Sequence, residues 1–539
     1  MANDKITSAS QKPSVSGGIR EETPHTHPKG GVKQISMMAM AIMIVTTIVS
    51  MRGLASQAEF GFTSIFYYVL AAIVFLVPYA LVCAELASTY TRSGGVFRWV
   101  SEAFGTRTGW LSMYLDWQMV VIWFPAVLMF GAVALAYIFW PEAFDARLAG
   151  NRVYTLIVVL GVYWVCTFNT FRGMKYANKL STLGGLCGTI IPAAVLIIMG
   201  VVYLLLGKTV YLPLDKPFWP DFSNFGTIVL AASIFLFFAG MEIQAVQVPA
   251  MKNPSKNFPK SVLIAALAIL AIFILGTLAI GVVIPESKIN LLQSLLVAYN
   301  DLWASIGAPW LGNVMAVLIT FGVLGQVSVV IAGPSTGLLA VGKAGFLPRS
   351  LQHTNKNGIQ TTILYVQAAI VSLLSLVLVL LPSVESAYQI LSQMSTIIYL
   401  IMVVIIYFAF VRLRHTAPNK ARGFKVPGGK FGMWLVTIVG VGGAVLAGVL
   451  SFIPPSQIKT GSPAVYVGVL IVGVALFIAL PLIVFARRKK SWRDANTTFY
   501  PFDWQIEGRK PGEVSRWSAG YQPTDAEVQA AFEKENQSA

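Results

Sequence analysis

The chain of 539 residues is 56% hydrophobic and only 12% charged, with a mean hydropathy of +0.70. Soluble domains carry about 25% charged residues, so a water-soluble fold would leave much of this apolar surface uncovered. The net charge of +16 does not indicate nucleic-acid binding, because the Lys and Arg residues lie in short loops between apolar stretches rather than on one polar face. Composition therefore predicts an all-α integral membrane protein, with the lipid bilayer as a partner and no nucleic acid.

Residues 1-33 are polar and contain several Gly, Pro and Ser, which is typical of a flexible tail. A membrane span needs about 20 apolar helical residues to cross about 30 Å of hydrocarbon. We count twelve such segments within 34-486, at 34-55, 62-87, 109-139, 152-170, 181-206, 226-250, 260-285, 309-340, 361-381, 385-411, 431-454 and 463-486. The stretch 285-308 is apolar but interrupted, so we expect an external amphipathic helix there rather than a thirteenth span.

Basic residues are concentrated in every second loop, and in membrane proteins such loops are retained on the cytoplasmic side. The basic loops contain Arg92, Arg98 and Arg107; Arg172, Lys175 and Lys179; Lys252, Lys256 and Lys260; Lys343, Arg349 and Lys356; and Arg412, Arg414, Lys420, Arg422, Lys425 and Lys430. We therefore expect a multi-pass protein of the cell inner (cytoplasmic) membrane with both termini cytoplasmic, consistent with the basic run 487-490 after the last span.

Residues 487-539 form a polar cytoplasmic tail that is rich in aromatic side chains, among them Phe499, Tyr500, Phe502 and Trp504. Disordered tails carry few aromatic residues. We therefore expect part of this tail to dock on another surface.

Two predicted spans carry polar or helix-breaking residues at membrane depth, where irregular backbone is tolerated only if it is buried or lines a cavity. The first span contains hydroxyl groups, a glycine and an arginine close to its outer half, and the sixth contains a glycine and a glutamate at mid-span. If five helices form a unit that repeats inverted, spans one and six are symmetry mates, and paired broken helices there predict a substrate site near the midplane. The residues concerned are Val49, Ser50, Met51, Arg52 and Gly53 in span one and Phe238, Gly240, Met241 and Glu242 in span six.

Such a site suits an amino acid, because half-helix N-termini offer N–H groups to a carboxylate and opposed carbonyl ends accept from an ammonium group. Glu242 is costly in hydrocarbon unless it is protonated, paired or wet, so we favour a functional role, with proton coupling as one possibility. Each of the other residues has a structural alternative. Gly240 would serve helix packing, Arg52 would extend to the outer interface, and Asp116 would form a packing hydrogen bond.

Three further polar positions are interpreted in the same way. Glu85, near the cytoplasmic end of span two, is expected to pair with a cation in a loop. Gln326 and Ser328 in span eight either line the substrate path or link neighbouring helices.

No histidine lies within a predicted span, which excludes a histidine proton relay in the membrane. Paired aspartates, a Ser/His dyad and metal-ligand clusters are also missing from the sequence at this depth. The three cysteines lie in apolar segments without metal-ligand spacing. We therefore expect a protein that is not an enzyme and that uses no cofactor and no metal.

The motifs resemble the amino acid–polyamine–organocation (APC) transporters, and in particular their glutamate/GABA antiporter branch. Gly94 to Gly105, with the sequence GGVFRWVSEAFG, is similar to the loop after span two in this superfamily. The branch is indicated by Met51-Arg52-Gly53-Leu54-Ala55, Phe218-Trp219-Pro220-Asp221-Phe222, Met251-Lys252-Asn253-Pro254, Lys356-Asn357-Gly358 and Val426-Pro427-Gly428-Gly429-Lys430. Together these motifs span roughly residues 35-486.

The resemblance implies a LeuT-like fold of two inverted five-helix repeats plus two C-terminal helices, working by alternating access. It also implies that Gln326 in span eight and Tyr399 in span ten join the two breaks around the substrate. Some members of this family fold the C-terminal tail into a plug over the cytoplasmic mouth. Some members also carry a glutamate at the position where this chain has Gln326.

Our first hypothesis is an exchanger of small amino acids, with glutamate, glutamine and GABA as leading substrates and with protons as possible partners. The alternative within the same fold is a proton-coupled importer of other amino acids or polyamines. A channel or receptor would show a ring of like charges or a pore filter, and the sequence contains neither.

Overall fold

The structure, a computed structural model, describes residues 35–92, 94–138, 142–173, 183–212, 218–220, 229–245, 251–455, 462–494, 499–518 and 523–538, with Val248 and Tyr521. All of them belong to one compact unit, Ile35–Ala539. The N-terminal residues 1-33, predicted to be a flexible tail, lie outside the described residues.

Within the described residues, nine helices are long and apolar enough to cross a membrane. They are the continuous stretch Thr63–Thr89, which contains α3 (Thr63–Ala71) and α4 (Val77–Thr89); α6 (Thr106–Ala136); α8 (Arg152–Thr170); Leu183–Leu205, which ends in α10 (Ile191–Leu205); α14 (Pro254–Val283); α16 (Trp310–Val341); α19 (Val384–Thr416); α20 (Gly429–Leu450); and α21 (Pro463–Ala486). A tenth span is formed by α1 (Met37–Ile48) and α2 (Arg52–Ala58) if this bent pair is counted as one.

Besides the span expected at 34-55, which is the bent pair α1 and α2, two of the twelve predicted spans are not continuous long helices. The span expected at 361-381 contains α17 (Thr361–Ser375) and the single turn α18 (Val377–Leu380). The span expected at 226-250 contains the short 3-10 helix Val229–Ser233, α12 (Ile234–Phe237) and α13 (Met241–Ala245), and part of it lies outside the described residues. The protein is thus all-helical with nine or ten spans by length and composition, and the count of twelve stays a prediction.

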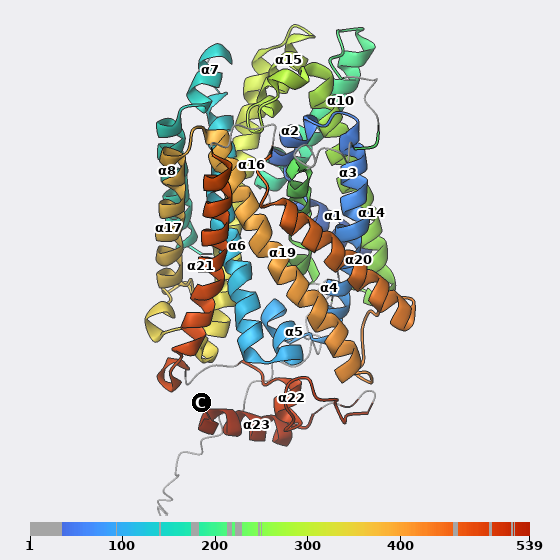
Figure 1. Cartoon of the computed structure of the whole chain (residues 1–539), viewed down its shortest axis with the longest axis vertical. Helices are drawn as coiled ribbons and strands as arrows, with labels where there is room; N and C mark the ends of the chain where they lie inside the picture. The colour runs from blue at the N-terminus through green and yellow to red at the C-terminus, as the bar shows by residue number, and fades with distance from the viewer. Residues whose placement is uncertain are drawn as a thin grey trace, which may run out of the picture. The chain divides into compact units, whose positions relative to one another are not determined.

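The stretch 285-308 contains α15 (Ser294–Ala304), whose eleven residues are too few for a span. A short helix rather than a thirteenth span was the expectation here. Figure 1 shows the long helices side by side, with α15 and α7 (Glu142–Ala149) at one end and α5 (Gly95–Phe104) at the other.

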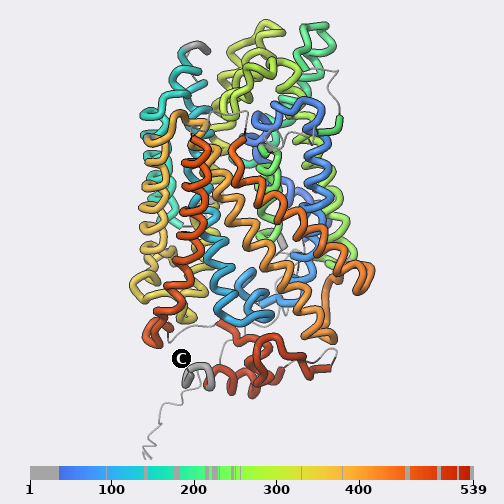
Figure 2. Tube along the Cα trace, viewed as in Figure 1, coloured from blue at the N-terminus to red at the C-terminus, as the bar shows by residue number. Residues whose placement is uncertain are grey.

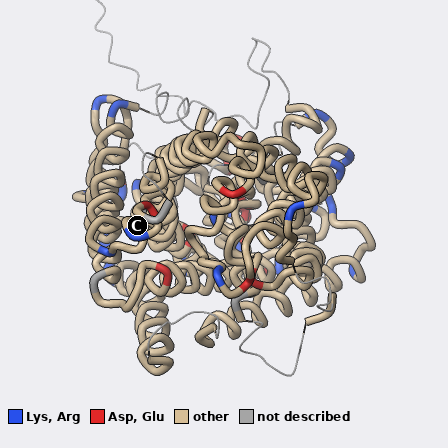
Figure 3. The backbone as a smooth tube through the Cα atoms, turned by 90° about the horizontal axis from the view of Figure 1, so that it is seen from above, with Lys and Arg blue, Asp and Glu red and all other residues tan. Residues whose placement is uncertain are grey.

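Burial differs sharply among the helices in a way that suits hydrocarbon solvent. In α6, 89% of the apolar window is buried, whereas the corresponding values for α20 and α21 are 28% and 22%. Large apolar side chains of the outer helices, such as Ile438 and Val472, are more than half exposed. In water this surface would be unfavourable, but lipid tails cover it at no cost, so α6 is a central helix and α20 and α21 are peripheral ones. Viewed along the helices, few positions are charged (Figure 3).

The C-terminal tail contains α22 (Asp503–Ile506) and α23 (Asp525–Ser538). Figure 2 shows it, in red, along the end of the helices that carries α5. Its described residues contact α5 and the segment after α19, as detailed below.

Candidate functional site

The first predicted break is present in the helix where span one was expected. α1 ends at Ile48 and α2 begins at Arg52, and the two helices meet at an angle of 66°. Val49 has an extended backbone, with φ −65° and ψ 121°, although its N–H still donates to the carbonyl of Val45. Ser50 and Met51 complete the connection, so the helical hydrogen-bond ladder is interrupted inside an otherwise apolar span.

The second break separates α12 from α13 and is formed by Phe238, Ala239 and Gly240. Gly240 has a φ of +106°, a conformation that side chains with a Cβ rarely adopt. A Cβ at this position would also lie 3.1 Å from Cγ2 of Thr47 in α1. Gly240 therefore both turns the chain and allows close approach of the first span.

The two breaks lie against each other. A Cβ on Gly53 would be 2.6 Å from the Phe237 ring, so α2 runs directly beside α12, and Gln57 donates to Ser233 over 3.1 Å. On the other side of the breaks, α1 approaches Gly240 at the start of α13. The segment after one break thus packs on the segment before the other, as expected for two antiparallel interrupted helices.

Glu242 is the first carboxylate after the second break and is 3% exposed. Its Oε2 accepts a hydrogen bond from the Tyr399 hydroxyl over 3.1 Å, and that hydroxyl accepts one from the Gly240 N–H over 3.4 Å. Its Oε1 has no hydrogen-bond partner among the described residues. The Tyr399 position, which was implied only by family resemblance, therefore lies in direct contact with the second break.

Asp116 of α6 lies close enough to Glu242 for the two charges to interact, which the sequence did not reveal. Sequence reasoning favoured a packing role for Asp116. The sequence shows Asp116 only as an acidic residue in an apolar helix. The packing of the helices identifies Glu242 as its neighbour. The Tyr79 ring lies beside the Tyr399 ring, with 6.3 Å between the two centroids.

Arg52 begins α2 and is 3% exposed, so its side chain is buried and does not extend to the outer interface. Its Cζ lies 5.2 Å from the centre of the Trp123 ring on α6. Tyr388 of α19 is also within electrostatic range. The Nε and Nη1 atoms of Arg52 have no hydrogen-bond partner among the described residues.

Ser50, Met51 and Gln326 line one small cavity of about 20 Å³ between the first break and α16. This is room for about one water molecule, so the site is closed in this conformation. Phe238 is fully buried and stacks on Phe273 of α14 with ring centroids 5.8 Å apart. Met241 is buried as well, whereas Ser50 and Gln326 are half-buried, and of the predicted residues that the structure describes only Ser50, Met51 and Gln326 line this cavity.

Three other observations concern the predicted polar residues, the cavities and the possibility of a metal site. Ser328 donates to the Leu324 carbonyl and lies 3.7 Å from the Cys166 sulfur, a link between α16 and α8. A larger cavity of about 640 Å³ is lined by residues of α10, α14 and α15, and none of the predicted site residues lines it. Among the described residues, no three His, Cys, Asp or Glu side chains are placed to hold a metal ion.

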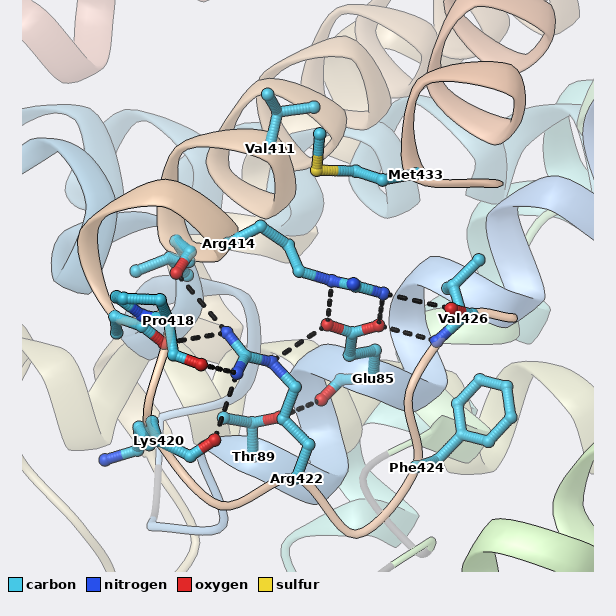
Figure 4. Close-up of polar contacts among 12 residues, drawn as sticks. Glu85, Thr89, Val411, Arg414, Pro418, Lys420, Arg422, Phe424, Val426 and Met433 are labelled. Atoms are coloured by element: carbon cyan, nitrogen blue, oxygen red, sulfur yellow. Dashed lines mark hydrogen bonds and ion pairs between the residues drawn. The ribbon is translucent and has the colours of Figure 1, made fainter. Parts of the chain in front are cut away.

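Glu85 of α4 pairs with loop and helix cations, as predicted from its position (Figure 4). Nε of Arg414 lies 2.5 Å from its Oε1, and Nε of Arg422 lies 3.0 Å from the same oxygen. Arg414 Nη2 and the Val426 N–H donate to Oε2 over 2.6 and 2.7 Å. The carboxylate thus holds the end of α19 and the following loop against α4.

The tail docks through Arg98 of α5. Its guanidinium donates to the carbonyls of Tyr500 and Pro501 and lies over the rings of Phe499 and Phe502 at 4.9 and 4.8 Å. The aromatic tail residues noted in the sequence are therefore part of a contact surface.

A carboxylate pair adjoins this contact. Glu102 of α5 accepts from the Asp503 N–H over 3.0 and 3.1 Å, and the Asp503 carboxylate pairs with Lys420. Burial, and then the nearby charge of Asp503, raises the pKa of Glu102 to about 8, against the opposing influence of Arg98 and Lys420. This buried carboxyl lies at the surface where the tail meets α5.

A family model described as amino acid permease matches residues 35–505. An uncharacterized transporter of Legionella pneumophila is 36% identical over 456 residues, which cover 85% of this chain and 97% of that protein. A glutamate/gamma-aminobutyrate antiporter of Lactococcus lactis is 26% identical over 486 residues, covering 87% of this chain and 96% of the antiporter. A probable agmatine/putrescine antiporter of the same species is 22% identical over 412 residues, covering 74% and 84%. The chain therefore belongs to the amino acid permease family of the amino acid–polyamine–organocation superfamily, and is a multi-pass membrane transporter rather than an enzyme.

Proposed function

We propose that this permease exchanges small amino acids by alternating access, with glutamate, glutamine and GABA as its leading substrates. The observation that carries the proposal is the pair of helix breaks in contact, seen at Gly53 against Phe237 and at Gly240 against Thr47. Interrupted helices that face each other at membrane depth mark the substrate site in transporters built from inverted repeats. The similarity to a glutamate/gamma-aminobutyrate antiporter at 26% identity supports this substrate class.

In this proposal the peptide groups at the breaks bind the zwitterion. The last carbonyl groups and first N–H groups of helical segments lack intrahelical partners, so the peptide groups around Ser50 and Met51 and their counterparts near Gly240 offer donors and acceptors, whereas the Val49 N–H is already bonded to Val45. Gln326 adds an amide beside Ser50 and Met51. Side chains around the breaks then discriminate between substrates.

Glu242 is the proposed proton-coupling residue. One of its oxygens is held by Tyr399, and the other has no partner among the described residues. Asp116 is near enough to interact with it, and two neighbouring carboxylates in a low-dielectric interior do not both ionise readily. A proton held by one of these two groups would be exchanged when the site opens to water.

The proposed architecture is a LeuT-like fold of twelve spans in the inner (cytoplasmic) membrane, with both termini cytoplasmic and the transporter domain at 34-486. The docked tail, 487-539, would then cover the cytoplasmic mouth, held by Arg98. Deletion of the tail should raise transport near neutral pH, and an unchanged rate would remove the plug from this proposal.

The exchange itself is tested in proteoliposomes that contain the purified full-length chain. Labelled glutamate is supplied outside, with unlabelled glutamate, glutamine, GABA or no amino acid inside. We expect internal substrate to accelerate uptake. Uptake that is indifferent to internal substrate contradicts exchange, and no uptake of any of the three contradicts the substrate class.

A second candidate is proton-coupled import of other amino acids or polyamines. It is favoured by the two acidic side chains, Asp116 and Glu242, which together would attract a cationic substrate. It predicts that empty liposomes accumulate agmatine, putrescine or basic amino acids when an inward proton gradient is imposed. The same liposomes distinguish the two candidates, because exchange requires internal amino acid and import requires the gradient.

A further inference from the structure

We propose that Arg52 is a specificity residue that binds a second carboxylate on the substrate, so that the permease prefers dicarboxylic amino acids to glutamine and GABA. This inference rests on the proposed function, because it places the substrate at the two helix breaks. It goes further by assigning the substrate's second charged group to one side chain. That side chain stands out because it is buried and has no carboxylate partner among the residues that the structure describes.

Two other arginines with comparably buried side chains have a carboxylate partner among the described residues. Arg414 and Arg422 pair with Glu85, and their side chains are 8% and 6% exposed. Arg52 has no carboxylate partner among the described residues, and the titratable side chain that interacts with it is the Tyr388 hydroxyl.

The unpaired state is energetically unfavourable. A guanidinium removed from water loses its hydration and recovers that loss only through a counter-ion and hydrogen bonds. Arg52 retains a compensating contact with the face of Trp123 at 5.2 Å. In the part of the chain that the structure describes, its buried Nε and Nη1 atoms have no hydrogen-bond acceptor. An arriving carboxylate would supply the charge and the acceptors that the protein leaves out.

The guanidinium geometry suits this ligand. The guanidinium carbon lies over the Trp123 ring, and the Nε and Nη1 donors have no acceptor among the described residues, so the donor edge that they form remains for a ligand. A carboxylate binds such an edge through two parallel N–H···O bonds, which an amide or an uncharged group reproduces only in part. Recognition of this kind discriminates between glutamate and glutamine, which have nearly the same shape.

The position of Arg52 relative to Glu242 separates the two charges of the site. Arg52 belongs to α2, which packs beside α12 and the helical turn before it through Gly53 and Gln57. Glu242 belongs to α13, on the other side of the break at Gly240. Positive charge thus lies on one side of the breaks and negative charge on the other, which matches a substrate with an additional carboxylate directed toward α2.

Arg52 lies near Trp123 of α6 and Tyr388 of α19, and further polar groups lie where these two helices meet. Ser392, one turn along α19 from Tyr388, and Gln118 of α6 both contain buried polar atoms without a hydrogen-bond partner among the described residues. Ser395 donates to the Met119 carbonyl over 2.9 Å, which brings this part of the two helices together. Since the cavity at the breaks is only about 20 Å³, substrate entry requires α2 to separate from this interface. That motion would expose Arg52.

The test compares Arg52→Gln with the wild-type chain and with Arg172→Gln, which removes an exposed arginine beyond the end of α8. KM and maximal rate are measured in proteoliposomes for labelled glutamate and labelled glutamine. We expect Arg52→Gln to raise the KM for glutamate about ten- to a hundredfold and to change the KM for glutamine by less than about threefold. Arg52→Lys should give an intermediate KM for glutamate, and Arg172→Gln should match the wild type.

Equal losses for glutamate and glutamine, or no change for either, would overturn the inference, because Arg52 would then be structural or would bind the carboxylate common to both. If Arg52→Gln does not fold, the wild-type chain in detergent decides: glutamate must protect it from thermal unfolding at lower concentrations than glutamine, and the reverse order overturns the inference. A wild-type chain that exchanges glutamine and GABA well but glutamate no better contradicts the role of Arg52 and leaves the proposed function intact.

Discussion

Replacing Glu85 with glutamine should destabilise the protein by several kcal/mol, although the shape of the side chain is almost unchanged. The carboxylate is 2% exposed and interacts with two arginines whose side chains are 8% and 6% exposed. Arg414 contacts both of its oxygens and Arg422 contacts one of them (Figure 4). In Glu85→Gln, both guanidinium groups lose their only carboxylate partner in the described residues.

Removal of one partner from a buried ion pair costs about 3–5 kcal/mol, chiefly because the remaining charge stays buried without compensation. The amide oxygen of glutamine still accepts the hydrogen bond from the Val426 N–H, so that 2.7 Å contact is retained. Arg422 also donates to the carbonyls of Ala417 and Lys420, which keeps it in place. We therefore expect a loss within that range rather than twice that amount.

The assay is equilibrium unfolding by SDS titration in mixed micelles, with Glu533→Gln as the control. Glu533 is an exposed carboxylate in the tail, and its replacement should change stability by less than about 0.5 kcal/mol. The double variant Glu85→Gln and Arg414→Gln should lose less stability than the sum of the two single losses, because one substitution removes a charge that the other leaves unpaired. A loss below about 1 kcal/mol for Glu85→Gln, or a loss in the double variant equal to the sum of the single losses, would refute this account of the pairing of Glu85 with Arg414 and Arg422.

Three further substitutions test the site and the tail. Gly240→Ala should cost about 1–3 kcal/mol and reduce transport, because its φ of +106° strains any side chain and its Cβ would press on Thr47; Gly161→Ala, whose Cβ would meet nothing within 4 Å, is the matched control, and equal stabilities of the two variants would contradict the role of the break. Glu242→Gln should alter or abolish the pH dependence of transport while the protein remains folded, as measured by uptake at several pH values and by size-exclusion chromatography; a wild-type pH profile would make Glu242 structural. The raised pKa of Glu102 means that the docked tail favours the protonated carboxyl, so this contribution to docking is present at acidic pH and is lost as pH rises through about 8. Trypsin should therefore cleave the tail faster above pH 8 than at pH 6, after correction for the pH dependence of trypsin measured on an unrelated substrate. Glu102→Gln should abolish this pH dependence of cleavage. If the variant keeps it, another titratable group is responsible.

The sequence by itself determined the class of protein and the places where its helices are interrupted. Apolar runs about twenty residues long predict spans directly, because hydrocarbon requires every backbone group to be bonded within its own helix. Hydroxyl groups and an arginine next to Gly53, and a glycine next to Glu242, are conspicuous in such runs, and both breaks occur there. The pairing of Glu85 with loop cations followed from its position near a helix end.

Tertiary structure decided which of these residues meet. Gly53 and Phe237 are far apart in sequence yet in contact, and no periodicity of either segment indicates the partner. In the same way, Asp116 becomes a neighbour of Glu242 only through the packing of α6. A hydropathy pattern is a local property that reports which solvent a segment prefers, whereas contacts between distant segments depend on shape complementarity across the whole bundle.

Arg52 shows this difference most clearly. In the sequence, Arg52 fits two interpretations because it lies near the outer half of a predicted span. Its side chain could extend to the membrane interface, or it could contact the substrate. Its burial against Trp123, with no carboxylate partner among the described residues, is a property of three helices together, α2, α6 and α19. The charge was therefore visible in the sequence, but the groups that surround it were decided by the fold.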